Sequence, residues 1–191
     1  MNSDKNPWET PEGKVVWKTE AQYWNWVRGA LRRLWADYPL RKVWKKNSLR
    51  PLTQEEKASG KFHPSTKNVG DCVFCKEVMA GSKLECDHIV ESEGCTDRRT
   101  AEKFLWHCGG QTSTNFQLVC KPCHKIKSYA ESKGISFEDA RLEKQAIQWE
   151  KENKGVNVQR GLLESLGVEN AQSLKAKEIR KAYIDYLKEK Q

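Results

Sequence analysis

Apolar residues recur at helical spacing in the N-terminal part of the chain. Thr19 and Gln22 have the spacing of a helix-capping box, and Pro39 supplies a stop signal. Between them the apolar positions are Tyr23, Val27, Ala30, Leu31, Leu34 and Trp35. A period of three to four residues is typical of one face of an amphipathic helix. The pattern therefore predicts a helix between Thr19 and Pro39.

The segments around this helix are more polar. Residues 1–13 contain two prolines and a glycine, and we expect them to form a flexible arm. The basic stretch 41–50 is compatible with a second helix, and residues 52–70 have the composition of a linker. Residues 14–67 are thus predicted to be a basic, tryptophan-rich helical region with a linker. Its tryptophans are interpreted as packing residues rather than as platforms for nucleobases.

Two short apolar runs in the middle of the chain predict β-strands. The first, residues 84–90, carries Asp87 and His88 side by side. Adjacent residues of a strand point to opposite faces, so these two side chains share one site only if the strand ends or bends there. The second run is residues 115–120.

A helix is expected directly after the second strand, through about Ser132. The connection between the strands, Ile89–Thr114, is 26 residues long and is interpreted as a long loop. Strand, loop, strand and helix make a small ββα unit within residues 68–132. The predicted fold class is therefore α+β, a ββα module flanked by N-terminal and C-terminal α-helical segments.

The C-terminal part, residues 133–191, is predicted to be helical. Ser136 can cap a helix that runs to about Asn153, and Gly155 follows it as a terminator. A final helical pair is expected, with the last helix starting at Ser173.

Charge is unevenly distributed along the chain. The net charge is +8, but residues 14–67 hold 13 lysines and arginines against 4 acidic residues, whereas residues 68–127 are balanced at 8 against 8. A localised cationic surface attracts polyanions, so double-stranded DNA is the leading candidate partner. The candidate DNA contacts are Arg28, Arg32, Arg33, Arg98, Arg99 and Lys125. No apolar run approaches the ~18 residues that span a bilayer, and we expect a cytoplasmic protein without membrane contact.

Four of the seven cysteines lie in two C-x2-C pairs, Cys72/Cys75 and Cys120/Cys123. Each pair can direct two thiolates to one tetrahedral ion, so the two pairs predict a structural zinc site. The remaining cysteines offer a second, weaker zinc possibility with one histidine: Cys86, Cys95, His107 and Cys108. Their spacing fits no ordinary zinc knuckle, and Cys86 is more simply a buried strand cysteine. His63, in the linker, is interpreted as a solvated surface residue.

The motifs D-H-I, N-x-Q-L-x-C and C-H-x-x-K follow one another between residues 72 and 128. In this order, and together with the two C-x2-C pairs, they resemble the HNH endonuclease family in its cysteine-containing form, which is common in phages and prophages. The resemblance implies a metal-dependent DNA endonuclease with a zinc-bound ββα module.

The resemblance also implies a role for each motif residue. His88 is then the general base, Asn115 holds the loop that orients His88, and Lys127 occupies the position of a lysine near the scissile phosphate. Asp87 and His124 are implied ligands of a divalent catalytic ion.

The chemistry independently requires residues of these types. An imidazole that titrates near neutrality can take a proton from the attacking water, and a cation can neutralise the charge that develops on phosphate. One carboxylate and one imidazole suit Mg²⁺, Mn²⁺ or another divalent ion, and the sequence does not choose among these metals.

Three alternatives remain open at this stage. The zinc module could bind DNA without cutting it, or a nuclease of this kind could act on RNA. A monomer with one ββα site is expected to nick one strand, whereas a homodimer could cut both. The target sequence and the biological role stay undetermined.

Overall fold

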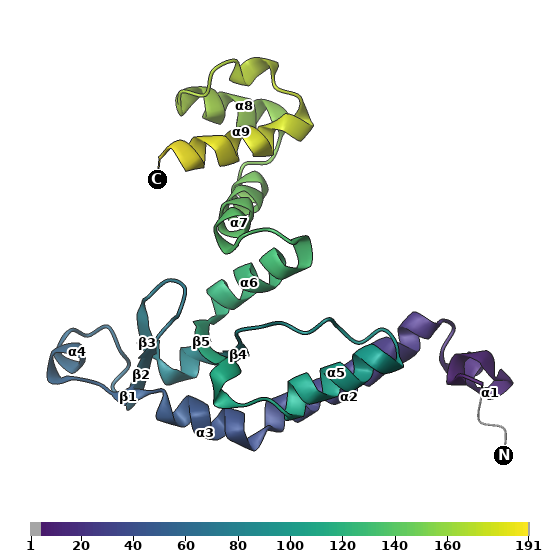
Figure 1. The fold of residues 1–191 in the computed structure, drawn as a ribbon. Helices are drawn as coiled ribbons and strands as arrows, with labels where there is room; N and C mark the ends of the chain where they lie inside the picture. The colour runs from purple at the N-terminus through teal and green to yellow at the C-terminus, as the bar shows by residue number, and fades with distance from the viewer. Residues whose placement is uncertain (1–4, 191) are drawn as a thin grey trace. The chain divides into compact units, whose positions relative to one another are not determined.

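The computed structural model describes residues 5–190, and they divide into two compact units between Lys121 and Pro122 (Figure 1). The first unit contains helices and strands, and the second is helical. The division falls inside the segment 68–132 that was expected to form one module. No helix in the described part of the chain is both long enough and apolar enough to cross a membrane.

The first unit contains helices and two small sheets. Its helices are α1 (Pro11–Val16), α2 (Glu20–Asp37), α3 (Pro39–Asn47), α4 (Gln54–Ala58) and α5 (Arg98–Gly109), with short 3-10 turns at Pro7–Glu9, Gly81–Lys83 and Ser113–Asn115. Its strands are β1 (Arg50–Pro51), β2 (Asn68–Asp71), β3 (Val78–Ala80), β4 (Leu84–His88) and β5 (Phe116–Cys120). Strands β1, β2 and β3 form one antiparallel sheet, and β4 pairs with β5 in another.

Helix α2 forms where the apolar pattern predicts it. The Thr19 hydroxyl accepts a hydrogen bond from the backbone N–H of Gln22 at 3.3 Å and so satisfies a donor at the helix start. The helix ends at Asp37, and Pro39 opens α3. The predicted second helix is thus present as α3.

The connection between β4 and β5 differs from the long loop that the sequence predicted, because it contains the 12-residue helix α5. Asp97 caps this helix through the backbone N–H of Thr100 at 2.8 Å. Phe104 and Cys108, four residues apart, turn toward α2, and the two helices lie side by side (Figure 1). Packing against α2 therefore buries the face of α5 that carries Phe104 and Cys108.

The segments expected to be a flexible arm and a linker contain more helix and strand than the sequence predicted. Residues 1–4 lie outside the described residues, but Pro7–Glu9 and α1 are folded, and Trp8 packs on Tyr23 and Trp24. Within the expected linker, α4 and β2 form, and β2 pairs with β3. These elements depend on contacts with distant parts of the chain, which a local pattern does not reveal.

Helices make up the second unit: α6 (Lys121–Lys133), α7 (Phe137–Glu152), α8 (Val156–Ser165) and α9 (Ala176–Glu189), with a 3-10 turn at Ala171–Ser173. Ser136 caps α7 as predicted, through the backbone N–H of Asp139 at 3.0 Å. The last helix begins at Ala176 rather than at Ser173, because the preceding residues form the 3-10 turn. Leu163 and Ile179 are fully buried between α8 and α9.

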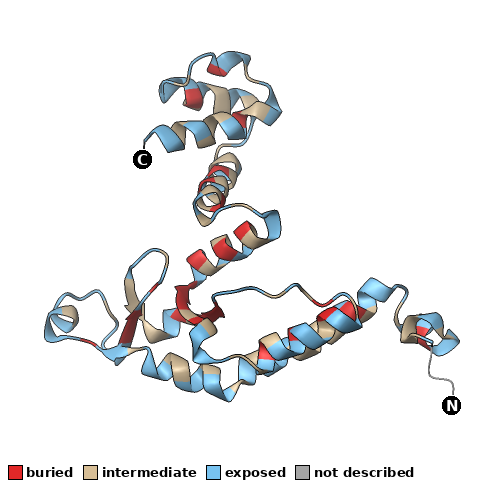
Figure 2. Cartoon of the chain, in the orientation of Figure 1, coloured by how far each residue is buried: buried red, intermediate tan, exposed pale blue. Residues whose placement is uncertain are grey.

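Buried residues of the first unit lie on the β4–β5 pair, on and beside β2, and on the facing sides of α2 and α5 (Figure 2). Trp24, Cys95, Phe104 and Cys108 form the apolar cluster between the helices. This cluster fixes α5 on α2 and thereby sets where the residues of α5 meet the strands.

We predict that Phe104→Ala lowers the free energy of unfolding by about 3–5 kcal/mol, because it removes a buried aromatic side chain from the α2–α5 cluster. Chemical denaturation of the full-length protein measures the change. Leu105→Ala on the same helix is the matched control and should cost much less, since Leu105 is 46% exposed. Equal losses for the two variants would show that α5 does not pack on α2 through Phe104.

Candidate functional site

Four cysteine sulfurs meet at one point. The Sγ atoms of Cys72, Cys75, Cys120 and Cys123 all lie within 4.8 Å of one another. Cys72 and Cys75 belong to the turn between β2 and β3, Cys120 ends β5, and Cys123 lies in the first turn of α6. The two C-x2-C pairs are therefore brought together as the sequence predicted.

The local backbone shapes the first pair into a tight turn. Lys76 adopts a left-handed conformation with φ 59°, and its N–H donates to the Cys72 carbonyl at 2.9 Å. The backbone N–H of Cys120 donates to the Cys72 sulfur at 3.3 Å. Burial raises the pKa of the Cys72 thiol, but amide donors from Cys120, Cys75 and Phe74 outweigh burial and lower the pKa to about 7.

This cluster has the chemistry of a structural zinc site. Tetrahedral zinc with Zn–S bonds of about 2.3 Å requires sulfurs roughly 4 Å apart, and the Cys75 and Cys120 sulfurs are 4.0 Å apart. A thiol whose pKa is lowered toward neutrality loses its proton to a metal readily. Four cysteines leave no coordination position open for a substrate, so a zinc ion here would have a structural role.

Asp87 and His88 occupy the end of β4. The strand ends at His88, but Asp87 is still paired with Gln117 in the ladder, so the two neighbouring side chains point to opposite faces of the sheet. Both residues are buried, and His88 pairs with Phe116 across the β4–β5 ladder. The side-chain amide of Gln117 donates to Asp87 Oδ2 and to the His88 carbonyl, each at 3.1 Å.

Asn115 holds the chain immediately after His88. Its Oδ1 accepts from the backbone N–H of Val90 at 2.9 Å, and its carbonyl accepts from Ile89 N–H at the same distance. Its Nδ2 donates to Gln111 Oε1 at 2.9 Å. Asn115 thus lies at the end of the β4–β5 pair that also carries Asp87 and His88, and it holds the backbone that follows His88.

The His88 imidazole lies between two other rings. The Trp35 ring centroid is 3.9 Å away with an interplanar angle of 33°, and the His107 centroid is 3.8 Å away at 38°. Trp35 from α2 and His107 from α5 therefore both pack closely on the imidazole, each with its ring tilted. His88 is consequently only 7% exposed.

Arg41 and Cys86 lie close to this stack. The Arg41 guanidinium is 5.0 Å from the centre of the Trp35 ring and donates to the Ala36 carbonyl at 3.0 Å. Burial raises the pKa of the Cys86 thiol to about 11, although the nearby Arg41 charge opposes this shift. Cys86 is therefore a buried, neutral strand cysteine, as predicted from the sequence.

The other residues singled out from the sequence are placed as follows. His124, Lys125 and Lys127 lie on α6 in the second unit, and Lys127 forms an ion pair with Glu131 one turn along. Cys95 and Cys108 are buried in the α2–α5 cluster, and burial raises the pKa of both thiols. In the described chain, only the two C-x2-C pairs form a cluster of metal ligands, so the second zinc possibility has no support. His63 is exposed, as expected.

The candidate DNA contacts differ in accessibility. Arg32 and Arg33 are exposed on α2, whereas Arg28 is half-buried and its Nε atom is buried with no hydrogen-bond partner among the described residues. Arg98 and Arg99 are exposed at the start of α5, and Arg99 pairs with Glu93 at 3.0 Å.

Sequence reasoning missed the positions of Trp35, His107, Gln117 and Arg41 around the site. Gln117 stands inside the N-x-Q-L motif, so the motif itself marked it. The other three meet His88 or its neighbours only through the packing of α2, α3 and α5, which no local spacing indicates.

Comparisons with known proteins add no relative. A scan against models of protein families gives no match. Searches of curated proteins and of solved structures likewise find no significant match.

We predict that the purified protein holds one tightly bound zinc and that Cys72→Ser loses it and destabilises the fold, because structural zinc contributes directly to folding. Elemental analysis and thermal denaturation measure the two effects. Cys95→Ser, a buried cysteine outside the cluster, is the control and should keep its zinc. Wild-type protein without zinc would contradict the assignment.

Proposed function

We propose that this protein is a metal-dependent DNA endonuclease that hydrolyses phosphodiester bonds, with a zinc-bound ββα module of the HNH type at its centre. One observation carries the proposal: Asp87, His88 and Asn115 lie at the same end of a β4–β5 pair that continues into the four-cysteine cluster. A domain built only to bind zinc has no need for an acid, an imidazole and an amide at that place.

In the proposed reaction His88 accepts the proton of the attacking water. Close packing by Trp35 and His107 restricts rotation of the imidazole. Asn115 supports this orientation through the backbone of Ile89 and Val90. Preorganisation of this kind reduces the cost of reaching a reactive geometry.

A divalent ion, Mg²⁺, Mn²⁺ or a related metal, would supply charge neutralisation for the phosphate. Asp87, whose carboxylate is oriented by Gln117, is the proposed ligand on β4. By resemblance to the HNH family, His124 is the second ligand and Lys127 a phosphate contact. The Lys127–Glu131 ion pair would have to open for that contact to form.

A second candidate is a zinc module that binds DNA without cutting it. The 7% exposure of His88 favours this reading, because a general base needs access to water. Cleavage assays on the purified protein separate the two candidates directly.

We predict that zinc-loaded wild-type protein nicks supercoiled plasmid in Mg²⁺ or Mn²⁺ and that His88→Ala slows nicking by on the order of 10²–10⁴. The substitution removes the base while DNA affinity and zinc content stay unchanged. His63→Ala, at an exposed histidine, should cleave like wild type. Undiminished cleavage by His88→Ala would exclude His88 as the base, and a wild type that binds DNA without nicking it would favour the second candidate.

We further predict that the double variant Arg32→Glu/Arg33→Glu binds duplex DNA more weakly, whatever its sequence. The slope of log affinity against log salt concentration should become shallower by about 1.8, since each lost phosphate contact contributes about 0.9. Both side chains are exposed on α2. Salt titration of duplex affinity measures the slope. Lys177→Glu/Lys181→Glu makes the same charge change on α9, and an equal effect there would show that only net charge matters.

A further inference from the structure

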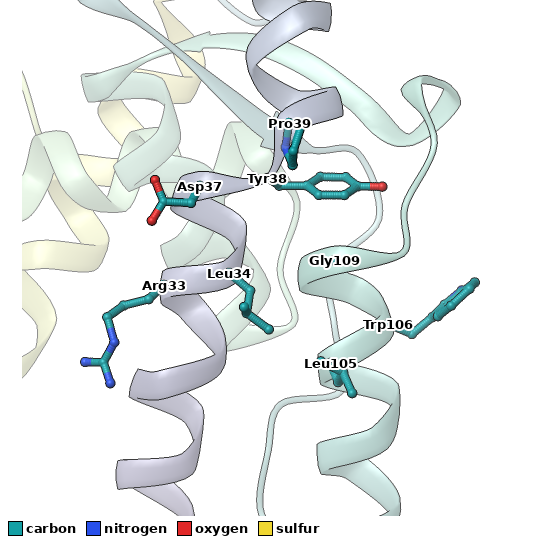
Figure 3. A pocket seen from close by; sticks show the side chains of 8 residues that line it. All are labelled: Arg33, Leu34, Asp37, Tyr38, Pro39, Leu105, Trp106 and Gly109. Carbon is teal, nitrogen blue, oxygen red and sulfur yellow. The ribbon is translucent and has the colours of Figure 1, made fainter.

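A cavity of about 550 Å³ lies between the C-terminal halves of α2 and α5, entirely within the first unit. Its size falls within the range of small-ligand sites. Leu34 from α2 and Leu105 from α5 contribute apolar walls, and Tyr38 closes one end (Figure 3). We call this cavity the α2–α5 groove.

Trp106 forms an aromatic platform at the edge of the groove. Its side chain is 69% exposed, although tryptophan is a costly residue to leave in water. The indole ring rests on Gly110, where an added Cβ would lie 2.4 Å from a ring atom. A glycine at this position therefore lets the backbone support one face of the ring while the indole stays accessible.

The groove is joined to the candidate active site by neighbouring residues. His107, which follows Trp106 on α5, stacks on His88. Tyr38, whose hydroxyl donates to the Gln111 carbonyl at 2.8 Å, lies 6.4 Å from Phe116, the cross-strand partner of His88. A ligand in the groove would therefore lie beside the proposed reaction centre.

The charges at the groove favour an anionic ligand. Asp37 forms an exposed ion pair with Lys42 at 3.0 Å. Arg33 borders the groove on the α2 side and has no ion pair among the described residues. Figure 3 shows Arg33 and Trp106 on opposite rims of the groove, each side chain directed outward from its helix. A cation on one side and an aromatic platform on the other match the phosphate and the base of a nucleic-acid strand.

We propose that the α2–α5 groove binds a single-stranded stretch of DNA, with an unpaired base stacked on Trp106 and the backbone directed toward Arg33. A base in the interior of a duplex is stacked on both faces by its neighbours, whereas an unpaired base in a single-stranded stretch can turn a face to Trp106. The inference rests on the proposed function and refines its substrate: DNA in which a single-stranded segment adjoins a duplex.

The test compares affinities for a blunt duplex and for the same duplex with a short single-stranded gap. Zinc-loaded, full-length protein is used without added Mg²⁺ or Mn²⁺, so binding is measured apart from cleavage. The wild type should bind the gapped DNA more tightly. Trp106→Ala should weaken binding to gapped DNA by about 5- to 150-fold, the range expected for one stacked base, and leave duplex affinity unchanged.

Two further variants make the test specific. Trp106→Phe retains an aromatic face and should keep most of the preference. Trp26→Ala removes another exposed tryptophan of the first unit, 58% exposed and outside the groove, and should bind like wild type. Sedimentation of each variant shows whether the substitution changes association between chains instead.

The inference is overturned if the wild type does not prefer gapped DNA, if Trp106→Ala keeps that preference, or if Trp106→Ala alters self-association rather than DNA binding. Its failure is distinct from failure of the proposed nuclease. If the protein shows the Trp106-dependent preference but never nicks plasmid, the result supports DNA binding in the groove and contradicts the proposed hydrolysis.

Discussion

The convergence of four cysteine sulfurs to within 4.8 Å is the constraint on which the centre of this structure depends. The turn that carries Cys72 and Cys75 also joins β2 to β3, and Cys120 ends β5. Any ion held by these sulfurs would fix β5 by its last residue. Because β5 pairs with β4 from Leu84 to His88, it would also fix the end of the ladder at which Asp87 and His88 lie. The candidate site then depends on a closed ligand set rather than on a large apolar core.

Aromatic packing provides the second constraint. Trp35 and His107 approach His88 from helices that lie on either side of it in the sequence, and the apolar cluster of Trp24, Phe104 and Cys108 keeps those helices together. The same helix pair carries the exposed arginines and the α2–α5 groove. In the proposed function, α2 and α5 therefore both orient the base and receive the DNA.

The sequence predicted those features that local chemistry determines. Capping residues Thr19 and Ser136 marked helix starts, the apolar run ending in Asp87 and His88 marked β4, and the paired C-x2-C spacing marked the sulfur cluster. Helix α5 was missed because its apolar face is short and is stabilised by α2, and its Cys108 and His107 resembled possible metal ligands. The stack of Trp35 on His88 joins residues 53 positions apart in the chain. Contacts of that kind arise from tertiary packing, which no single-sequence pattern expresses.

The central claim is that a hydrolytic centre requiring a divalent ion is built around Asp87, separate from the zinc cluster. Electron paramagnetic resonance of Mn²⁺ added to zinc-loaded protein tests it most directly, because it detects the ion itself and does not depend on the choice of DNA. The account predicts one Mn²⁺ site in the wild type that is lost in Asp87→Ala, with zinc content unchanged in both. Mn²⁺ binding that is the same in the wild type and in Asp87→Ala would contradict it.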